Sequence, residues 1–179
     1  NKDVPSLFEL AKIYASKGSI SGRRRARELL QKAIWIDSKN IKCRMLFASL
    51  MEKFSKKMAF DEYEKIIEVD SAYAEAWYNL GRIKEQDFYE YHNSLMHEAG
   101  DDASLSYESF AKSDFLEAES YLKKAIKYDS LNADNYLHLS FLYEDAGEVE
   151  KGISLLKKLT KIYPDNKDAH LFLGLLYYK

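Results

Sequence analysis

The residues best suited to chemistry include two histidines that lie close to a group of carboxylates. His92 and His97 are five residues apart, and Glu98, Asp101 and Asp102 follow them closely. These side-chain types bind metal ions, but two helical ligands must share a face, as they do at three- or four-residue spacing. Because five-residue spacing points the two imidazoles apart, we predict that this group forms no metal site.

The remaining candidates for catalysis do not form a reactive set. Cys43 is the single cysteine, and it falls on an apolar packing position where a thiol is usually buried and inert. His138 and His170 fall on the same helical pattern, in groove or core positions. No Gly-rich phosphate-binding loop and no nucleophile–base–acid arrangement can be identified. We therefore predict no catalytic residues, no enzymatic activity and no cofactor.

Four arginines form a possible anion site in the stretch SGRRRARELL, and they are Arg23, Arg24, Arg25 and Arg27. They lie near the start of an expected helix, where the backbone adds positive potential. Residues 58–179, however, carry thirteen Lys and Arg against twenty-four Asp and Glu, which would repel a long polyanion. We favour arginines that cover an outer helix surface, with RNA binding as the alternative, and do not expect nucleic acid as the partner.

The composition predicts that helices position these residues. Gly and Pro together number only nine of 179 residues, and the chain has only three Val and one Thr, two of the β-branched types that strands prefer. Ala, Leu, Glu and Lys, which favour helices, are abundant. With 31% charged residues and no apolar run near the roughly 20 residues of a membrane span, we expect a soluble protein, cytoplasmic or exported.

An internal repeat organises the helices. Residues 43–71 and 136–164 align without gaps at a period of about 34 residues, and in each the apolar residues recur at three- and four-residue steps. In the second segment Gly147 interrupts the apolar stripe and is predicted to stop a helix. Each unit is therefore predicted to consist of two helices and a tight turn.

These units resemble the tetratricopeptide repeat, whose first helix carries an aromatic residue, Leu-Gly and Tyr. The third unit shows Trp77, Leu80 and Gly81, and later Ala118. The other units carry the pattern as Leu7, Leu10, Ala11, Tyr14, Ala26, Leu30 and Ala33; as Cys43, Leu46, Phe47, Leu50, Ala59, Tyr63 and Ile66; as Tyr136, Leu139, Ser140, Tyr143, Gly152, Leu156, Leu159 and Pro164; and as His170, Leu173, Gly174 and Tyr177.

The sequence also departs from the family pattern. Ser38, Ser71 and Ser130 replace the usual closing proline, and we expect them to cap the next helix. The stretch RRRARELLQKAI is also similar to the half-a-repeat family of RNA-processing scaffolds, which stays open as an alternative. The main resemblance implies an all-α, right-handed solenoid of antiparallel helix pairs in one domain. Its repeats would span residues 5–38, 40–73, 74–132 and 133–166, with a partial unit at 167–179.

The third unit carries an insertion. Ser140 and Gly152, the small residues of the fourth unit, are twelve positions apart in the sequence. The equivalent pair of the third unit, Gly81 and Ala118, is thirty-seven positions apart, so this unit contains a long extra segment between its two helices. We predict a helix over residues 74–98, a turn at 100–102, a short helix over 104–112, and a restart capped by Ser113 or Asp114.

The insertion, about residues 86–112, has two interpretations. It is either a tolerated loop extension or a helical arm that contacts a partner. The arm's contact residues would be Phe88, Tyr91, Leu95, Tyr107 and Phe110. Exposed aromatic residues on such an arm favour some contact.

The resemblance implies a non-catalytic scaffold that binds a peptide or protein in its concave groove. By repeat phase, the groove residues would be Phe8, Lys12, Arg44, Tyr78, Arg82, Leu137, Phe141, Leu171 and Leu175. Only Asn79 matches the set of Lys, Asn and Arg residues with which some family members clamp a C-terminal carboxylate, so we do not expect that activity. Self-association is the alternative, since residues 1–57 have a charge balance of +9 and residues 58–179 of −11.

Overall fold

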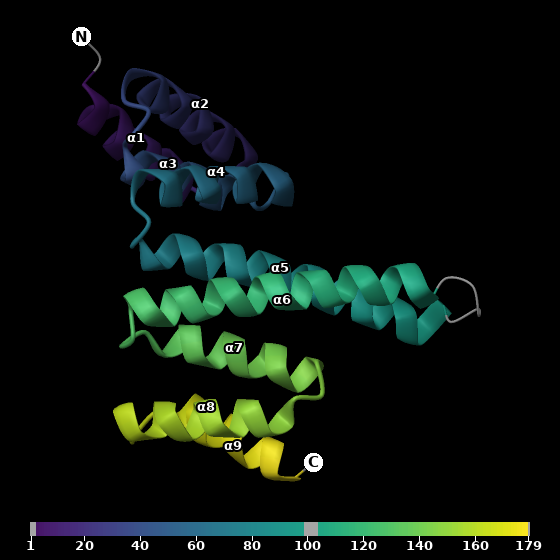
Figure 1. Cartoon of the computed structure of the whole chain (residues 1–179). Helices are drawn as coiled ribbons and strands as arrows, with labels where there is room; N and C mark the ends of the chain where they lie inside the picture. Colours follow the sequence, from purple (N-terminus) through teal and green to yellow (C-terminus); the bar gives the residue numbers. More distant parts are fainter. Residues whose placement is uncertain (1–2, 99–103, 179) are drawn as a thin grey trace. The chain divides into compact units, whose positions relative to one another are not determined.

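The structure, a computed structural model, describes residues 3–98 and 104–178, with side chains described for 3–91 and 111–178. This part of the chain contains nine helices and no strand, which confirms the all-α prediction (Figure 1). The helices are α1 (Val4–Ser16), α2 (Ile20–Ile36), α3 (Ile41–Met51), α4 (Lys56–Val69), α5 (Ala74–Glu98), α6 (Ser104–Tyr128), α7 (Ala133–Asp145), α8 (Val149–Ile162) and α9 (Lys167–Tyr178).

The chain divides into two compact units, residues 1–76 and residues 77–179. In the first unit α1 packs on α2, α2 on α3 and α3 on α4. In the second unit α6 packs on α7, α7 on α8 and α8 on α9. Within each unit these helices therefore pack on their neighbours in sequence, as a solenoid requires, because a single helix pair cannot bury its own apolar face.

Small residues let the paired helices approach closely. Ala11, Ala26, Ala59 and Ala118 are fully buried. A methyl group placed on Gly81 of α5 would lie only 2.7 Å from the Leu122 side chain of α6, so no larger residue fits there without a shift. The small residues predicted at these positions thus serve close packing.

The turns between helices differ from the prediction in one respect. Ser38 and Ser130 do not cap the following helices; instead, Asn40 accepts a hydrogen bond from the Cys43 amide, and Asn132 accepts one from the Asp134 amide. An asparagine placed directly before the helix reaches the free amides of the first turn. Gly147 has a φ of 73° after α7, which confirms the predicted helix stop.

Helix α5 continues through Glu98, as the sequence predicts, but α6 differs from the prediction. It runs without interruption from Ser104 to Tyr128, so neither Ser113 nor Asp114 caps a new helix. Asp114 instead accepts a hydrogen bond from the Lys84 ammonium group at 2.8 Å, and Glu117 lies 3.1 Å from the same group. Burial alone would lower the pKa of Lys84, but its hydrogen bonds to Asp114 and Glu117 outweigh burial and raise it. This interaction joins α5 to α6 where a cap was expected.

Candidate functional site

Four rings form a continuous aromatic row across α5, α7 and α9 in the second unit. The ring centroids of Tyr78 and His138 are 5.3 Å apart, those of His138 and Phe141 5.9 Å, and those of Phe141 and Phe172 4.4 Å. Each pair is edge-to-face, an arrangement that the ring quadrupoles favour. The structure thus brings together two predicted groove residues, Tyr78 and Phe141, from helices far apart in sequence.

A carboxylate holds the centre of this aromatic row. Nδ1 of His138 lies 2.7 Å from a carboxylate oxygen of Glu85, and both side chains are mostly buried. Since Glu85 is on α5 and His138 on α7, the contact fixes the ring that links Tyr78 to Phe141. Sequence reasoning missed Glu85 and Phe172, although Tyr78 and Glu85 are seven residues apart and therefore share a helix face.

The other groove residues predicted in the second unit divide into exposed and buried side chains. Leu171 is 58% exposed and Leu175 is 50% exposed on α9, which leaves apolar surface beside Phe172. Arg82 is half-buried on α5. Leu137 is only 8% exposed and belongs to the core formed with Leu156, so little of it is left for a ligand.

In the first unit the predicted groove residues also differ in how far their side chains are buried. The ammonium group of Lys12 lies 5.5 Å from the centre of the Phe8 ring and 3.1 Å from a Glu9 carboxylate oxygen. Arg44 is buried: its guanidinium group pairs with Glu62, and its Nε donates to the Ser38 carbonyl at 2.7 Å. Arg44 therefore joins α3 to α4, which sets it apart from the exposed predicted residues.

The predicted arm is anchored in the core at its base. Phe88 is 6% exposed and packs on Phe115 at a centroid distance of 5.7 Å, in one cluster with Ala111 and Tyr143. Tyr91, one turn further along α5, is 37% exposed. The predicted contacts Leu95, Tyr107 and Phe110 lie outside the residues whose side chains are described, as do His92, His97, Glu98, Asp101 and Asp102.

We also compared the other candidates from the sequence, a metal site, a reactive cysteine and a membrane span, with the described residues. No group of three or more His, Cys, Asp or Glu side chains in this part of the chain is placed to hold a metal ion. Cys43 is buried, and burial, followed by the charge of Asp37, raises the pKa of its thiol. Among the helices described, none is long and apolar enough to span a membrane.

The arginine stretch lies on the surface of α2. Arg23 donates to the Gly18 carbonyl, Arg25 lies 3.1 Å from Glu28, and the Arg27 guanidinium lies 3.9 Å from the centre of the Phe54 ring. Three of the four arginines are thus engaged by their own chain. This arrangement agrees with side chains that cover an outer helix surface.

Comparison with known proteins identifies the fold. Residues 109–176 match the family model described as "Tetratricopeptide repeat". The chain has the tetratricopeptide repeat fold. A crystal structure of MamA protein is similar to this chain, with 20% sequence identity and a TM-score of 0.71. The alignment covers 98% of this chain and 81% of the MamA chain. No curated protein matches the sequence.

Two further tetratricopeptide-like structures agree with this result. A thermophilic TPR protein of Thermus thermophilus has 16% identity and a TM-score of 0.68, covering 98% of this chain and 82% of its own. MamA from Desulfovibrio magneticus RS-1 has 14% identity and a TM-score of 0.67, covering 92% and 78%. Tetratricopeptide-repeat proteins act in general as protein-interaction scaffolds, because stacked repeats present an extended surface.

Proposed function

We propose that this chain is a non-catalytic scaffold that binds a peptide or protein segment along the first helices of its repeats. The aromatic row of Tyr78, His138, Phe141 and Phe172 carries this proposal, because it continues across α5, α7 and α9. Aromatic side chains supply much of the binding energy at protein interfaces, since they bury large area and lose little conformational entropy. The exposed Leu171 and Leu175 extend this surface with aliphatic anchors.

The expected ligand has apolar side chains at intervals that match the row. An extended strand or an amphipathic helix would place its anchors against successive rings. Because Arg82 lies one helical turn from Tyr78, an acidic residue on the ligand would add a charged contact. The predicted arm would give a second contact through Tyr91, whose side chain is exposed on α5.

The test is affinity measurement with peptides selected against the chain from a random-peptide display library. Tyr78→Ala and Phe141→Ala should each weaken a selected peptide by about 1 kcal/mol or more, roughly a fivefold rise in Kd. Tyr128→Ala is the matched control, because Tyr128 is an exposed tyrosine at the end of α6 and outside the row. If all three variants bind equally well, the row is not the binding surface.

Self-association is the second candidate function, and the charge distribution favours it. Residues 1–57 carry fourteen Lys and Arg against five Asp and Glu, while the rest of the chain is acidic. The basic part of one copy would then attract the acidic part of another, and salt would weaken the contact. Sedimentation at low and high salt distinguishes this function, since a monomer at low salt and high concentration contradicts it.

A further inference from the structure

Trp35 on α2 is 87% exposed, although Trp side chains are highly buried on average. In the second helix of each repeat, the last turn closes with a backbone hydrogen bond to the carbonyl of Ala33, Ile66, Ala125 or Leu159. The residue two positions after that carbonyl is exposed in all four repeats, and it is Trp35, Glu68, Lys127 or Lys161. Three repeats thus carry a charged side chain where the first carries Trp35, so packing does not account for this Trp.

Trp35 lies on the face of α2 that points away from the core, in line with a second apolar residue. Ile20 is 77% exposed at the other end of the helix. Ile20, Arg24, Gln31 and Trp35 are separated by four, seven and four residues, which places them on one side of a helix. The buried residues of α2 are on the opposite side, and they are Gly22, Ala26, Leu29, Leu30 and Ala33. The exposed face therefore has two apolar anchors about 22 Å apart, with polar side chains between them.

The polar part of this face is basic. Residues 20–39 carry six Arg and Lys against two Asp and Glu, a balance of +4. Arg25 lies 3.1 Å from Glu28. Arg24 and Lys32 are exposed and form no ion pair with any residue that the structure describes. A partner would therefore meet two apolar anchors together with unpaired positive charges.

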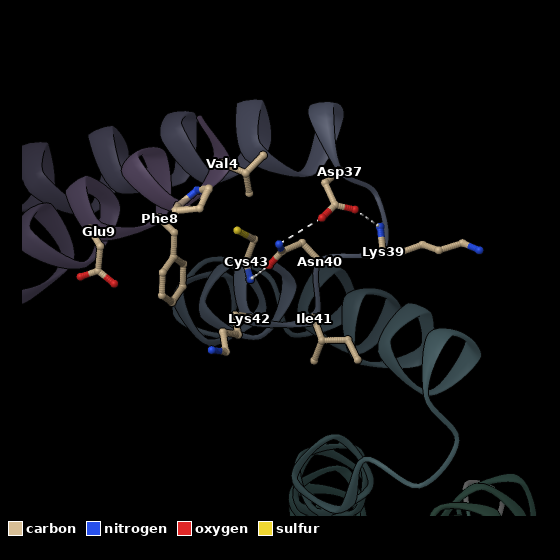
Figure 2. A pocket seen from close by; sticks show the side chains of 10 residues that line it. Val4, Phe8, Glu9, Asp37, Lys39, Asn40, Ile41, Lys42 and Cys43 are labelled. Carbon is tan, nitrogen blue, oxygen red and sulfur yellow. Dashed lines mark hydrogen bonds between the residues drawn. The ribbon is translucent and has the colours of Figure 1, made fainter. Parts of the chain in front are cut away.

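The end of α2 is fixed close to Trp35. The Asp37 backbone amide donates to the Ala33 carbonyl at 2.9 Å and closes the last turn. One carboxylate oxygen of Asp37 accepts from the Asn40 side chain at 3.1 Å, and the other accepts from the Lys39 backbone amide at 3.2 Å (Figure 2). Docking through Trp35 would therefore cost little ordering of the backbone.

An anionic phospholipid surface matches this face. Trp is enriched at the headgroup level of membranes, where its ring meets apolar groups and its N–H stays hydrated. Each Lys or Arg near an anionic leaflet contributes about 1 kcal/mol. The centre of a protein–protein interface is depleted of charged side chains, whereas here charged side chains lie between the two anchors. A lipid surface therefore fits better than an acidic protein.

We propose that α2 docks its exposed face on an anionic phospholipid surface, with the Trp35 ring at the headgroup level and Arg24 and Lys32 at lipid phosphates. The helix would lie parallel to the surface, because its anchors are at both ends. Repulsion from the acidic residues 58–179 is screened beyond about 8 Å at physiological salt. This contact uses neither the aromatic row nor charge pairing between copies, so it does not depend on the proposed function.

The test is co-sedimentation with vesicles of phosphatidylcholine alone and with vesicles of phosphatidylcholine and phosphatidylserine in equimolar amounts. The chain should bind the mixed vesicles and not the neutral ones. Trp35→Lys introduces the residue that α6 and α8 carry at this position, and it adds positive charge. It should nevertheless weaken binding by about tenfold, because the apolar anchor is lost. Tyr178→Lys is the matched control, since Tyr178 is 92% exposed on α9, and it should not weaken binding.

A second pair of variants tests the charges of the face. Arg24→Glu combined with Lys32→Glu should abolish binding to the mixed vesicles. Lys53→Glu combined with Lys57→Glu makes the same change of charge on exposed residues elsewhere in the first unit, and it should leave most of the binding.

Fluorescence reports whether the Trp35 ring enters the lipid. The chain has two Trp residues, and Trp77 is only 8% exposed. Brominated phosphatidylcholine in the mixed vesicles should therefore quench the unmodified chain and leave Trp35→Lys unquenched.

The proposal is overturned by equal binding to neutral vesicles, by full binding of Trp35→Lys, or by an equal loss in the two charge variants. Binding to soluble polyglutamate without binding to vesicles would also overturn it, and would assign the face to an acidic protein. Thermal melting of each variant confirms that it is folded before binding is compared.

Discussion

The hydroxyl of Tyr143 donates a hydrogen bond to Oε1 of Glu119 at 2.8 Å, and this contact joins α7 to α6. Lys123 lies 2.8 Å from the same oxygen. Burial alone would raise the pKa of Glu119, but the hydrogen bonds from Lys123 and Tyr143 outweigh burial and lower it. Burial and the bond to Glu119 also raise the pKa of Tyr143. The charged form of Glu119 is therefore the form that the fold stabilises.

This contact predicts a pH-dependent stability difference. A lowered pKa in the folded state gives stability that is present above the unfolded value of about 4.3 and is lost as the pH falls through the folded value. Tyr143→Phe should therefore destabilise the protein by about 1 to 3 kcal/mol at pH 7, since a charged partner loses its donor. The difference from the unmodified chain should shrink steadily below about pH 4, as measured by urea unfolding.

Tyr163→Phe is the matched control for that measurement. The Tyr163 hydroxyl donates to the Leu131 backbone carbonyl, a neutral acceptor in the same unit. Removing this hydroxyl should lower the free energy of unfolding by a similar or smaller amount. Because the acceptor is neutral, this loss should not change as the pH falls below about 4. Parallel pH profiles for the two variants would contradict the role assigned to the Glu119 charge.

Two glycines at equivalent repeat positions should respond oppositely to alanine. A methyl group on Gly81 would lie 2.7 Å from Leu122, whereas nothing lies within 4 Å of one on Gly174. Gly81→Ala should therefore destabilise the protein by about 1 to 3 kcal/mol. Gly174→Ala should stabilise it by about 0.5 to 1 kcal/mol, because alanine favours the helix and meets no neighbour. Chemical denaturation measures both, and a loss in both variants would mean that α9 packs more tightly than the structure shows.

The repeat period was sufficient to predict the helices, because each helix carries one apolar stripe that must pack on a neighbouring helix. The continuation of α5 through Glu98 followed from the absence of a breaker. The continuity of α6 did not, because Ser113 and Asp114 read as a cap by local preference. Asp114 instead pairs with Lys84, a residue 30 positions away. Such a contact cannot be seen in a local window.

The candidate site was predictable only in part for the same reason. Repeat phase placed Tyr78 and Phe141 on one side of their helices, and the structure brings both into one aromatic row. Repeat phase could not show that Arg44 pairs with Glu62, since charge and spacing alone leave an arginine free to face solvent or the neighbouring helix. The helix caps, in contrast, could have been predicted from the sequence. Asp37 and Asp129 each accept a hydrogen bond from the backbone amide two residues later in the chain, and the next residue is the asparagine that caps the following helix.

The third prediction concerns the inserted segment of α5 and α6. Phe88 and Ala111 lie in the core cluster with Leu122 and Tyr143, so the base of the predicted arm belongs to the second unit. Deleting residues 92–109 and closing the chain with a short Gly-containing turn keeps both side chains. This deletion should leave the repeats folded and lower the Tm by only a few degrees, because insertions at inter-helix turns contribute little to stability.

A longer deletion, of residues 88–112, is the matched comparison. It removes Phe88 and Ala111, so Phe115 and Tyr143 lose packing partners. Loss of a buried phenylalanine costs about 3 to 5 kcal/mol, which should lower the Tm well beyond the shorter deletion or unfold the second unit. Circular dichroism during thermal melting distinguishes the two. If the shorter deletion also unfolds the protein, the whole insertion is core, and its assignment as an arm that contacts a partner has to be abandoned.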